Sequence, residues 1–111
     1  MAKSLSVGVA QRMLPTVSVP TISEVYATPP EVTLTTIVVK TSANPGGLYA
    51  LNVEGSIDGV DWYPVKSILT ENFKNDKAFV EVETALPLLR LNLVNPAGVS
   101  TTVNAITKKR S

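Results

Sequence analysis

The chain has 111 residues, 44% of them hydrophobic and only 17% charged, and ten Lys and Arg side chains against nine Asp and Glu give a formal net charge of +1. It contains no cysteine and no histidine, which excludes disulfides, thiolate nucleophiles and catalytic triads built on an imidazole base. The length fits one domain, and the near-neutral charge provides no overall field that would draw the chain to nucleic acid or to an anionic membrane.

Residues 1–30 combine apolar and hydroxyl side chains with four prolines, at Pro15, Pro20, Pro29 and Pro30. Because proline cannot donate a ladder hydrogen bond, we expect this segment to be an extended N-terminal arm with at most short edge strands. Its apolar side chains are too numerous for a solvated tail. Those that we expect to act in assembly are Leu5, Val7, Val9, Met13 and Leu14. The surface on which the arm lies is either the protein's own sandwich or a neighbouring subunit.

Residues 31–111 consist of short β-branched runs separated by turn residues, which predicts one antiparallel β-sandwich domain, jelly-roll-like and of about six strands. The first strand is Thr33–Thr41, which ends at an Asn-Pro-Gly-Gly turn. Residues 49–56 alternate, so that Tyr49, Leu51 and Val53 share one face. Further strands are expected near residues 62–65, 79–83, 88–95 and 101–107. No apolar period of 3.6 residues is sustained, so helix content should be low.

The segment 53–63 is the most informative part of the sequence. Gly55 permits a bend, Asp58 with Gly59 makes a turn, and Trp62 returns a large apolar ring toward the core. We interpret it as a structural hairpin with Trp62 mainly buried. The alternative is that Trp62, Tyr63 and Tyr49 are exposed together as a stacking platform for a sugar.

Clusters of carboxylates suggest two further sites, and we reject both. Glu54, Asp58 and Asp61 offer oxygen ligands for Ca²⁺, but their spacing does not match an EF-hand loop, so we expect neither metal nor cofactor. Glu81 and Glu83 lie on one strand face, where either could act with a distant carboxylate as an acid/base pair. Alternating acids on an exposed strand are typical of solvation, and we expect that the chain is not an enzyme.

Two stretches resemble a known group of proteins. Residues 53–63, reading VEGSIDGVDWY, resemble the "GS.DG..W" hairpin of small β-sandwich proteins in tailed-bacteriophage virions. Residues 89–105, reading LRLNLVNPAGVSTTVNA, are similar to the paired closing strands of the same proteins. Similar sequence motifs also occur in discoidin-like sugar-binding modules. The resemblance implies a jelly-roll-like sandwich with a structural role in the virion, as a capsid decoration or cement subunit or as a head or tail component.

The leading functional hypothesis is therefore a virion structural protein that binds the major capsid protein or another virion protein. The alternative is a carbohydrate-binding or host-adhesion module. The low charged fraction indicates a surface that is partly covered, so we expect a homo-oligomer. No apolar run resembles a signal-peptide core or a membrane span, and we expect the chain to be made in a host cytoplasm and to end in the virion. The basic run of Lys108, Lys109 and Arg110 is interpreted as a solvated tail, with no nucleic-acid partner.

Overall fold

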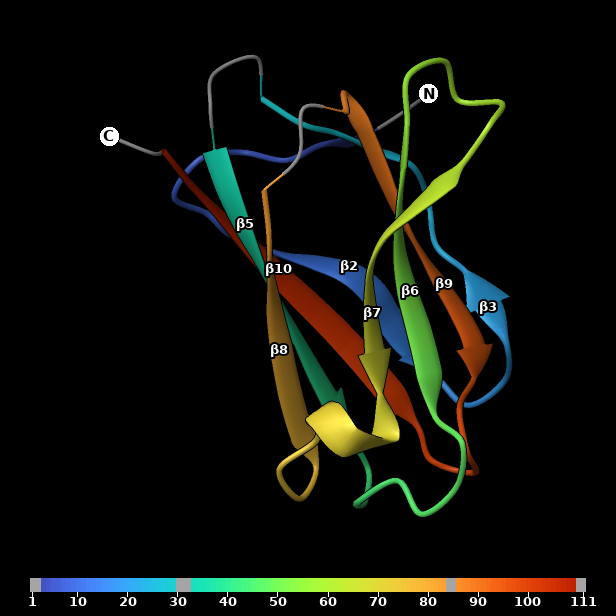
Figure 1. The fold of residues 1–111 in the computed structure, drawn as a ribbon. Coiled ribbons are helices and arrows are strands. Elements are labelled where there is room, and N and C mark those ends of the chain that lie inside the picture. Colours follow the sequence, from blue (N-terminus) through green and yellow to red (C-terminus); the bar gives the residue numbers. More distant parts are fainter. Residues whose placement is uncertain (1–2, 30–32, 84–85, 110–111) are drawn as a thin grey trace.

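The computed structural model describes residues 3–29, 33–83 and 86–109, and it is a β-sandwich (Figure 1). The strands are β1 (Lys3–Ser4), β2 (Ala10–Val17), β3 (Thr21–Ile22), β4 (Tyr26–Ala27), β5 (Thr33–Thr41), β6 (Ala50–Ser56), β7 (Tyr63–Leu69), β8 (Lys77–Val82), β9 (Leu88–Asn95) and β10 (Thr101–Lys109). The described residues contain one helical element, the three-residue 3₁₀ turn η1 (Thr70–Asn72). The prediction of an all-β sandwich is confirmed. No helix in the described ranges has the length and apolar character needed to cross a membrane.

The two sheets divide the strands unequally. One sheet runs in the order β1-β4-β9-β6-β7, with β3 also paired to β9, and the other runs β2-β10-β5-β8. Neighbouring strands are antiparallel, with the exception of the short β1–β4 pair. Strands β7 and β8 are the edges on the same side of the sandwich, and the chain passes from one to the other through η1 (Figure 1).

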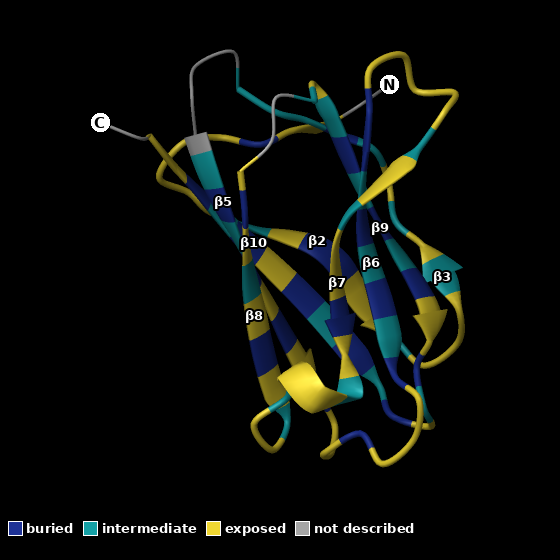
Figure 2. Cartoon of the chain, viewed as in Figure 1, coloured by how far each residue is buried: buried dark blue, intermediate teal, exposed yellow. Residues whose placement is uncertain are grey.

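The core lies between the sheets and follows the alternation of each strand (Figure 2). On β9 the side chains of Leu89, Leu91 and Leu93 are buried, while Arg90 and Asn92 on the opposite face are partly exposed. The alternation of a half-buried strand is therefore present in β9. The same alternation buries Leu51 and Val53 on β6.

The N-terminal segment differs from the expected arm. It contributes β1 to β4, and β2 pairs with β10 inside the four-stranded sheet. Leu5, Met13 and Leu14 are at most 4% exposed within the core cluster, so three of the five residues assigned to assembly pack against their own domain. Val7 and Val9 remain exposed. The boundary expected between residues 30 and 31 therefore does not separate an arm from the sandwich.

A proline is compatible with β2 because β2 is an edge strand. The pairing of β2 with β10 shifts register between Thr101 and Asn104, opposite the part of β2 that carries Pro15. An edge position and a bulge are the places where a sheet tolerates a residue without an N–H group. Pro30 and Arg110, which the sequence analysis placed in the arm and in the basic tail, lie outside the described residues.

Candidate functional site

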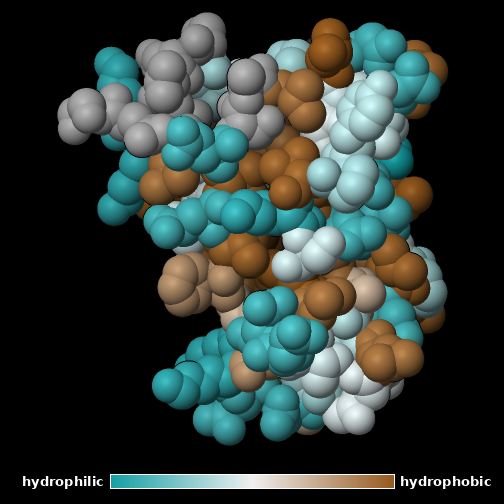
Figure 3. Space-filling model, viewed as in Figure 1, coloured by the Kyte–Doolittle hydropathy of each residue, from teal (hydrophilic) through white to brown (hydrophobic). Residues whose placement is uncertain are grey.

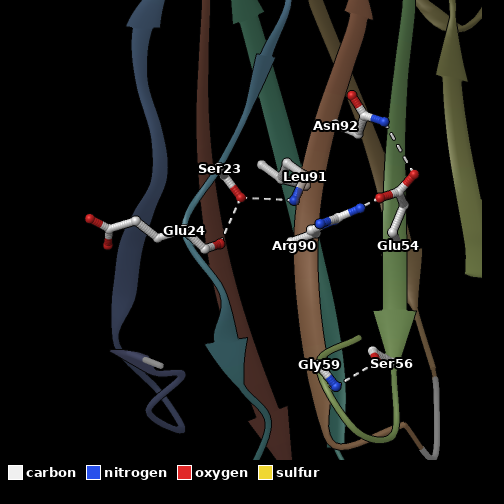
Figure 4. Close-up of polar contacts among 8 residues, drawn as sticks. All are labelled: Ser23, Glu24, Glu54, Ser56, Gly59, Arg90, Leu91 and Asn92. Carbon is white, nitrogen blue, oxygen red and sulfur yellow. Dashed lines mark hydrogen bonds and ion pairs between the residues drawn. The ribbon is translucent and has the colours of Figure 1, made fainter. Parts of the chain in front are cut away.

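The turn between β6 and β7 is fixed by its own side chains. The amides of Val60 and Asp61 donate to Oδ1 of Asp58 at 2.9 and 3.1 Å, and the hydroxyl of Ser56 donates to the same oxygen. The Gly59 amide in turn donates to Ser56 Oγ at 2.8 Å (Figure 4). The hydrogen bonds from the amides of Val60 and Asp61 hold the pKa of the Asp58 carboxyl below its usual value. The turn is therefore organised before any partner binds.

Two glycines are needed for this geometry. Gly59 has a φ of +81°, in the region that side chains rarely adopt. At Gly55 an added Cβ would lie 2.6 Å from Cδ1 of Leu86 and 3.1 Å from Cγ2 of Val65. Gly55 therefore serves close packing at the end of β6, as well as the bend that the sequence suggested.

The tip of this hairpin, defined here as residues 57–61, exposes two large apolar side chains. Ile57 is 72% exposed and Val60 is 76% exposed, with the exposed carboxylates of Asp58 and Asp61 between and after them. Apolar side chains held out by a fixed turn are suited to contact with another protein surface.

Next to the tip, four side chains on the outer face of the larger sheet form a cluster, which we call the Arg90 cluster: Glu54, Trp62, Arg90 and Asn92. Arg90 and Glu54 face each other across β9 and β6, with Nε and Oε1 2.8 Å apart, and Asn92 donates to the other oxygen of Glu54 at 3.2 Å (Figure 4). The guanidinium carbon of Arg90 lies 4.2 Å from the centre of the Trp62 ring, a cation–π contact. The side chains of Arg90 and Glu54 are 22% and 13% exposed. The cluster is a partly buried ion pair that holds the indole against the sheet.

Polar contacts continue across the same sheet. Ser67 on β7 donates to Asn52 on β6 at 2.9 Å. At the other side of β9 the Leu91 amide donates to the hydroxyl of Ser23, and that hydroxyl donates to the carbonyl of Glu24 (Figure 4). These contacts connect β6, β7, β9 and the segment at Ser23 and Glu24, and together these elements form one polar outer face.

The three aromatic residues proposed as a sugar platform are not brought together. Tyr63 is 55% exposed, Trp62 is half-buried against Arg90, and Tyr49 is 2% exposed inside the core. The Tyr49 hydroxyl shares a hydrogen bond of 2.9 Å with Thr101 Oγ1, and its ring meets Phe73 edge to face at 4.8 Å. Burial raises the pKa of the Tyr49 phenol. Tyr49 is therefore a core residue and presents no ring face to a ligand.

The expectation that Trp62 belongs mainly to the core is also wrong. Trp62 precedes β7 and packs on the outward side chain of Arg90, outside the core cluster. Arg90 and Asn92 lie on the outward face of β9, and no local pattern in the sequence indicates their partner. That partner is Glu54, which the register of β6 against β9 sets opposite Arg90 from 36 positions away.

Within residues 3–29, 33–83 and 86–109, the carboxylates show no arrangement suited to a metal. Among the described residues, no three His, Cys, Asp or Glu side chains lie close enough together to hold an ion. Glu54 is engaged by Arg90 and Asn92, and Asp58 by the turn amides. The polar side chains and turn amides at this end of the molecule hold one another in place. They therefore form a surface of fixed shape.

The geometry defines a two-sheet β-sandwich with a preorganised hairpin at one end. Neither a protein-family model nor a curated protein sequence matches the chain. Among solved structures, the fold is similar to that of the SPBc2 prophage-derived protein YomS, with a TM-score of 0.65. The likeness covers 90% of this chain and 92% of that one, at 8% sequence identity. At this identity the likeness is one of fold.

Proposed function

We propose that the chain is a structural subunit of a tailed-bacteriophage virion, a capsid decoration or cement protein or a minor head or tail component, that binds other virion proteins. The observation that carries this proposal is the likeness of fold to a prophage-derived protein, which covers 90% of this chain and 92% of that one. The resemblance of the hairpin 53–63 to hairpins of small virion proteins supports it from the sequence. A binding role also suits a chain without histidine or cysteine whose clustered polar groups are satisfied by one another.

The contact surface that we propose is the hairpin tip. Ile57 and Val60 project from a turn that is already ordered, so little conformational entropy is lost when they are covered. Asp58 and Asp61 add negative charge beside them. The complementary surface on the partner is an apolar socket with a basic rim.

The virion role is tested by the composition of particles. Particles released from a culture that carries the gene are purified on a density gradient and quantified by mass spectrometry. The chain should be present in a fixed ratio to the major capsid or tail protein. If it is abundant in the lysate but absent from the particles, the proposal is wrong.

The role of the tip is tested in the same particles with a double variant, Ile57→Asp with Val60→Asp. Introducing charge at two contact anchors should lower incorporation at least about tenfold, because anchors of this kind contribute more than about 1.4 kcal/mol. The matched control is Leu48→Asp, which alters a side chain 84% exposed before the opposite end of β6. Equal incorporation of the double variant and the control would remove the tip as the contact.

The second candidate is a carbohydrate-binding or host-adhesion module. It is favoured by Tyr63, whose side chain is 55% exposed. It is opposed by the burial of Tyr49 and by the position of Arg90 over one face of Trp62. A glycan array separates the two: binding that is lost in Tyr63→Ala supports the module, and no binding by the folded wild-type chain excludes the glycans on the array.

A further inference from the structure

The four sheet edges differ in how well they are protected. On β2, Pro15 interrupts the edge, and the Tyr26 hydroxyl lies 3.1 Å from the carbonyl oxygens of residues 12 and 13. On β7, Pro64 and a register shift interrupt the edge, and β1 is only two residues long. Proline, bulges and short strands are the usual means by which proteins prevent edge pairing. Strand β8 has six residues and no proline.

The hydrogen bonds of β5 show which main-chain groups of β8 remain free. The Thr41 amide donates to the carbonyl of Asp76 at 2.9 Å, which makes Lys40 and Lys77 a non-hydrogen-bonded pair. Ladder bonds alternate along an antiparallel pair, so residues 78, 80 and 82 bond to β5. The N–H and C=O groups of Phe79 and Glu81 therefore point away from β5. In the described part of the chain no hydrogen bond is formed to these four groups.

The start of β8 is closed by a tight turn. The Lys74 amide donates to the carbonyl of Lys77 at 2.8 Å, and the Lys77 amide donates to the carbonyl of Lys74 at 3.3 Å. Lys74 thus occupies the position that a partner strand would take beside Lys77. The free edge is limited to residues 78–82, and its central residue is Val80.

The side of the sandwich that carries this edge is apolar. Val65 on β7 and Val80 on β8 are partly buried against the core, and Phe79 is 66% exposed. In Figure 3, viewed as in Figure 1 with β7 and β8 in front, apolar atoms reach the surface of this side above and below a band of hydrophilic atoms. A second surface laid over β8 would remove this apolar area from water.

We propose that β8 pairs antiparallel with β8 of a second copy of this chain, about a two-fold axis at Val80, to give a continuous eight-stranded sheet. In this register Phe79 faces the partner's Glu81 as a hydrogen-bonded pair, and the symmetry repeats the pair, so all four free groups are satisfied. Val80 faces the partner's Val80 on the inner side. A two-fold axis at Phe79 would instead require hydrogen bonds from the partner strand to the main chain of Lys77. Those main-chain groups are already bonded to Lys74, so the register centred on Val80 is selected. The inference uses a different surface from the hairpin tip and does not depend on the virion role.

The register is tested by single cysteines, since the chain has none of its own. Residues opposite each other in a non-hydrogen-bonded pair have Cα atoms about 4.5 Å apart, within the range of a disulfide. Val80→Cys should therefore give a disulfide-linked dimer on mild oxidation. Phe79→Cys and Glu81→Cys place the two cysteines at diagonal positions, with Cα atoms about 7–8 Å apart, and should cross-link far more slowly. Equal cross-linking of all three variants, or none in Val80→Cys, would overturn the proposal.

A proline provides the second test because it removes one free amide and leaves the β5 ladder intact. Glu81→Pro should weaken dimerisation about 30-fold in sedimentation equilibrium, since two intermolecular hydrogen bonds are lost per dimer. The matched control Glu81→Thr removes the same charge but keeps the amide, and should dimerise like the wild type. Circular dichroism verifies the fold of each variant. A wild-type chain that stays monomeric at every concentration, or a folded Glu81→Pro that dimerises fully, refutes the β8 dimer whatever the particle experiment gives.

Discussion

The substitution Leu14→Ala tests whether the N-terminal segment belongs to the domain's own core. Leu14 is 1% exposed on β2, in the cluster shared by both sheets. Removing three buried carbons costs about 2.4 kcal/mol in transfer free energy, and the cavity raises the expected loss to about 3–4 kcal/mol. With a urea dependence of about 1.5 kcal/mol per molar, the unfolding midpoint should fall by about 2 M.

The matched control is Val9→Ala, which alters an apolar side chain that is 53% exposed in the same segment. Its effect on the free energy of unfolding should stay within about 0.5 kcal/mol. Both variants are melted in urea at several protein concentrations. If Leu14→Ala behaves like Val9→Ala, or loses stability only when diluted, the segment is held by another subunit and the reasoning fails.

Three further outcomes follow from the hairpin and the Arg90 cluster. Gly55→Ala should lower the free energy of unfolding by about 1–3 kcal/mol in urea melts, because the new Cβ lies 2.6 Å from a leucine methyl carbon; an unchanged midpoint would contradict this packing. Arg90→Ala should cost about 1–3 kcal/mol by leaving the partly buried Glu54 carboxylate without its charged partner, whereas Lys3→Ala, in an exposed ion pair, should leave the urea midpoint almost unchanged. Asp58 has a lowered pKa, so its stabilising effect should be complete above about pH 4 and disappear as the pH falls through the folded-state value. The gap in melting temperature between the wild type and Asp58→Ala should narrow accordingly in acid, and a constant gap would refute the assignment.

The strands after residue 31 were predictable because their signal is local. A strand with one face on a core alternates apolar and polar residues, and the turn residues between strands have fixed conformational roles. Expected ranges such as 49–56 and 88–95 therefore correspond to β6 and β9. The Asp58 and Gly59 turn was recognisable for the same reason, since a side chain that caps its own backbone acts within a few residues.

The candidate site was predictable only in part. The sequence drew attention to Trp62 and Tyr63 in the hairpin, and the structure exposes Tyr63 there. The prediction that Trp62 packs toward the core was wrong, because Trp62 lies in the turn before β7, where the alternation of a strand does not apply. Tyr49 was assigned correctly to the face of Leu51 and Val53, and that same face buries it. The assignment of Tyr49 to this face and its use as an exposed ring were therefore incompatible.

The class of fold, most strand positions, the hairpin turn and the exclusion of imidazole and thiol chemistry follow from the amino-acid sequence. Which strands pair is visible only in the folded chain, because register joins residues that are far apart in sequence. This pairing sets Glu54 beside Arg90 and β2 beside β10. The prolines restricted where the N-terminal segment could pair, but its apolar side chains gain the same burial against any complementary surface. Whether Leu5, Met13 and Leu14 cover their own core or a neighbour depends on the shape of the completed sandwich, which here leaves an edge of β10 and a space between the sheets that this segment fills.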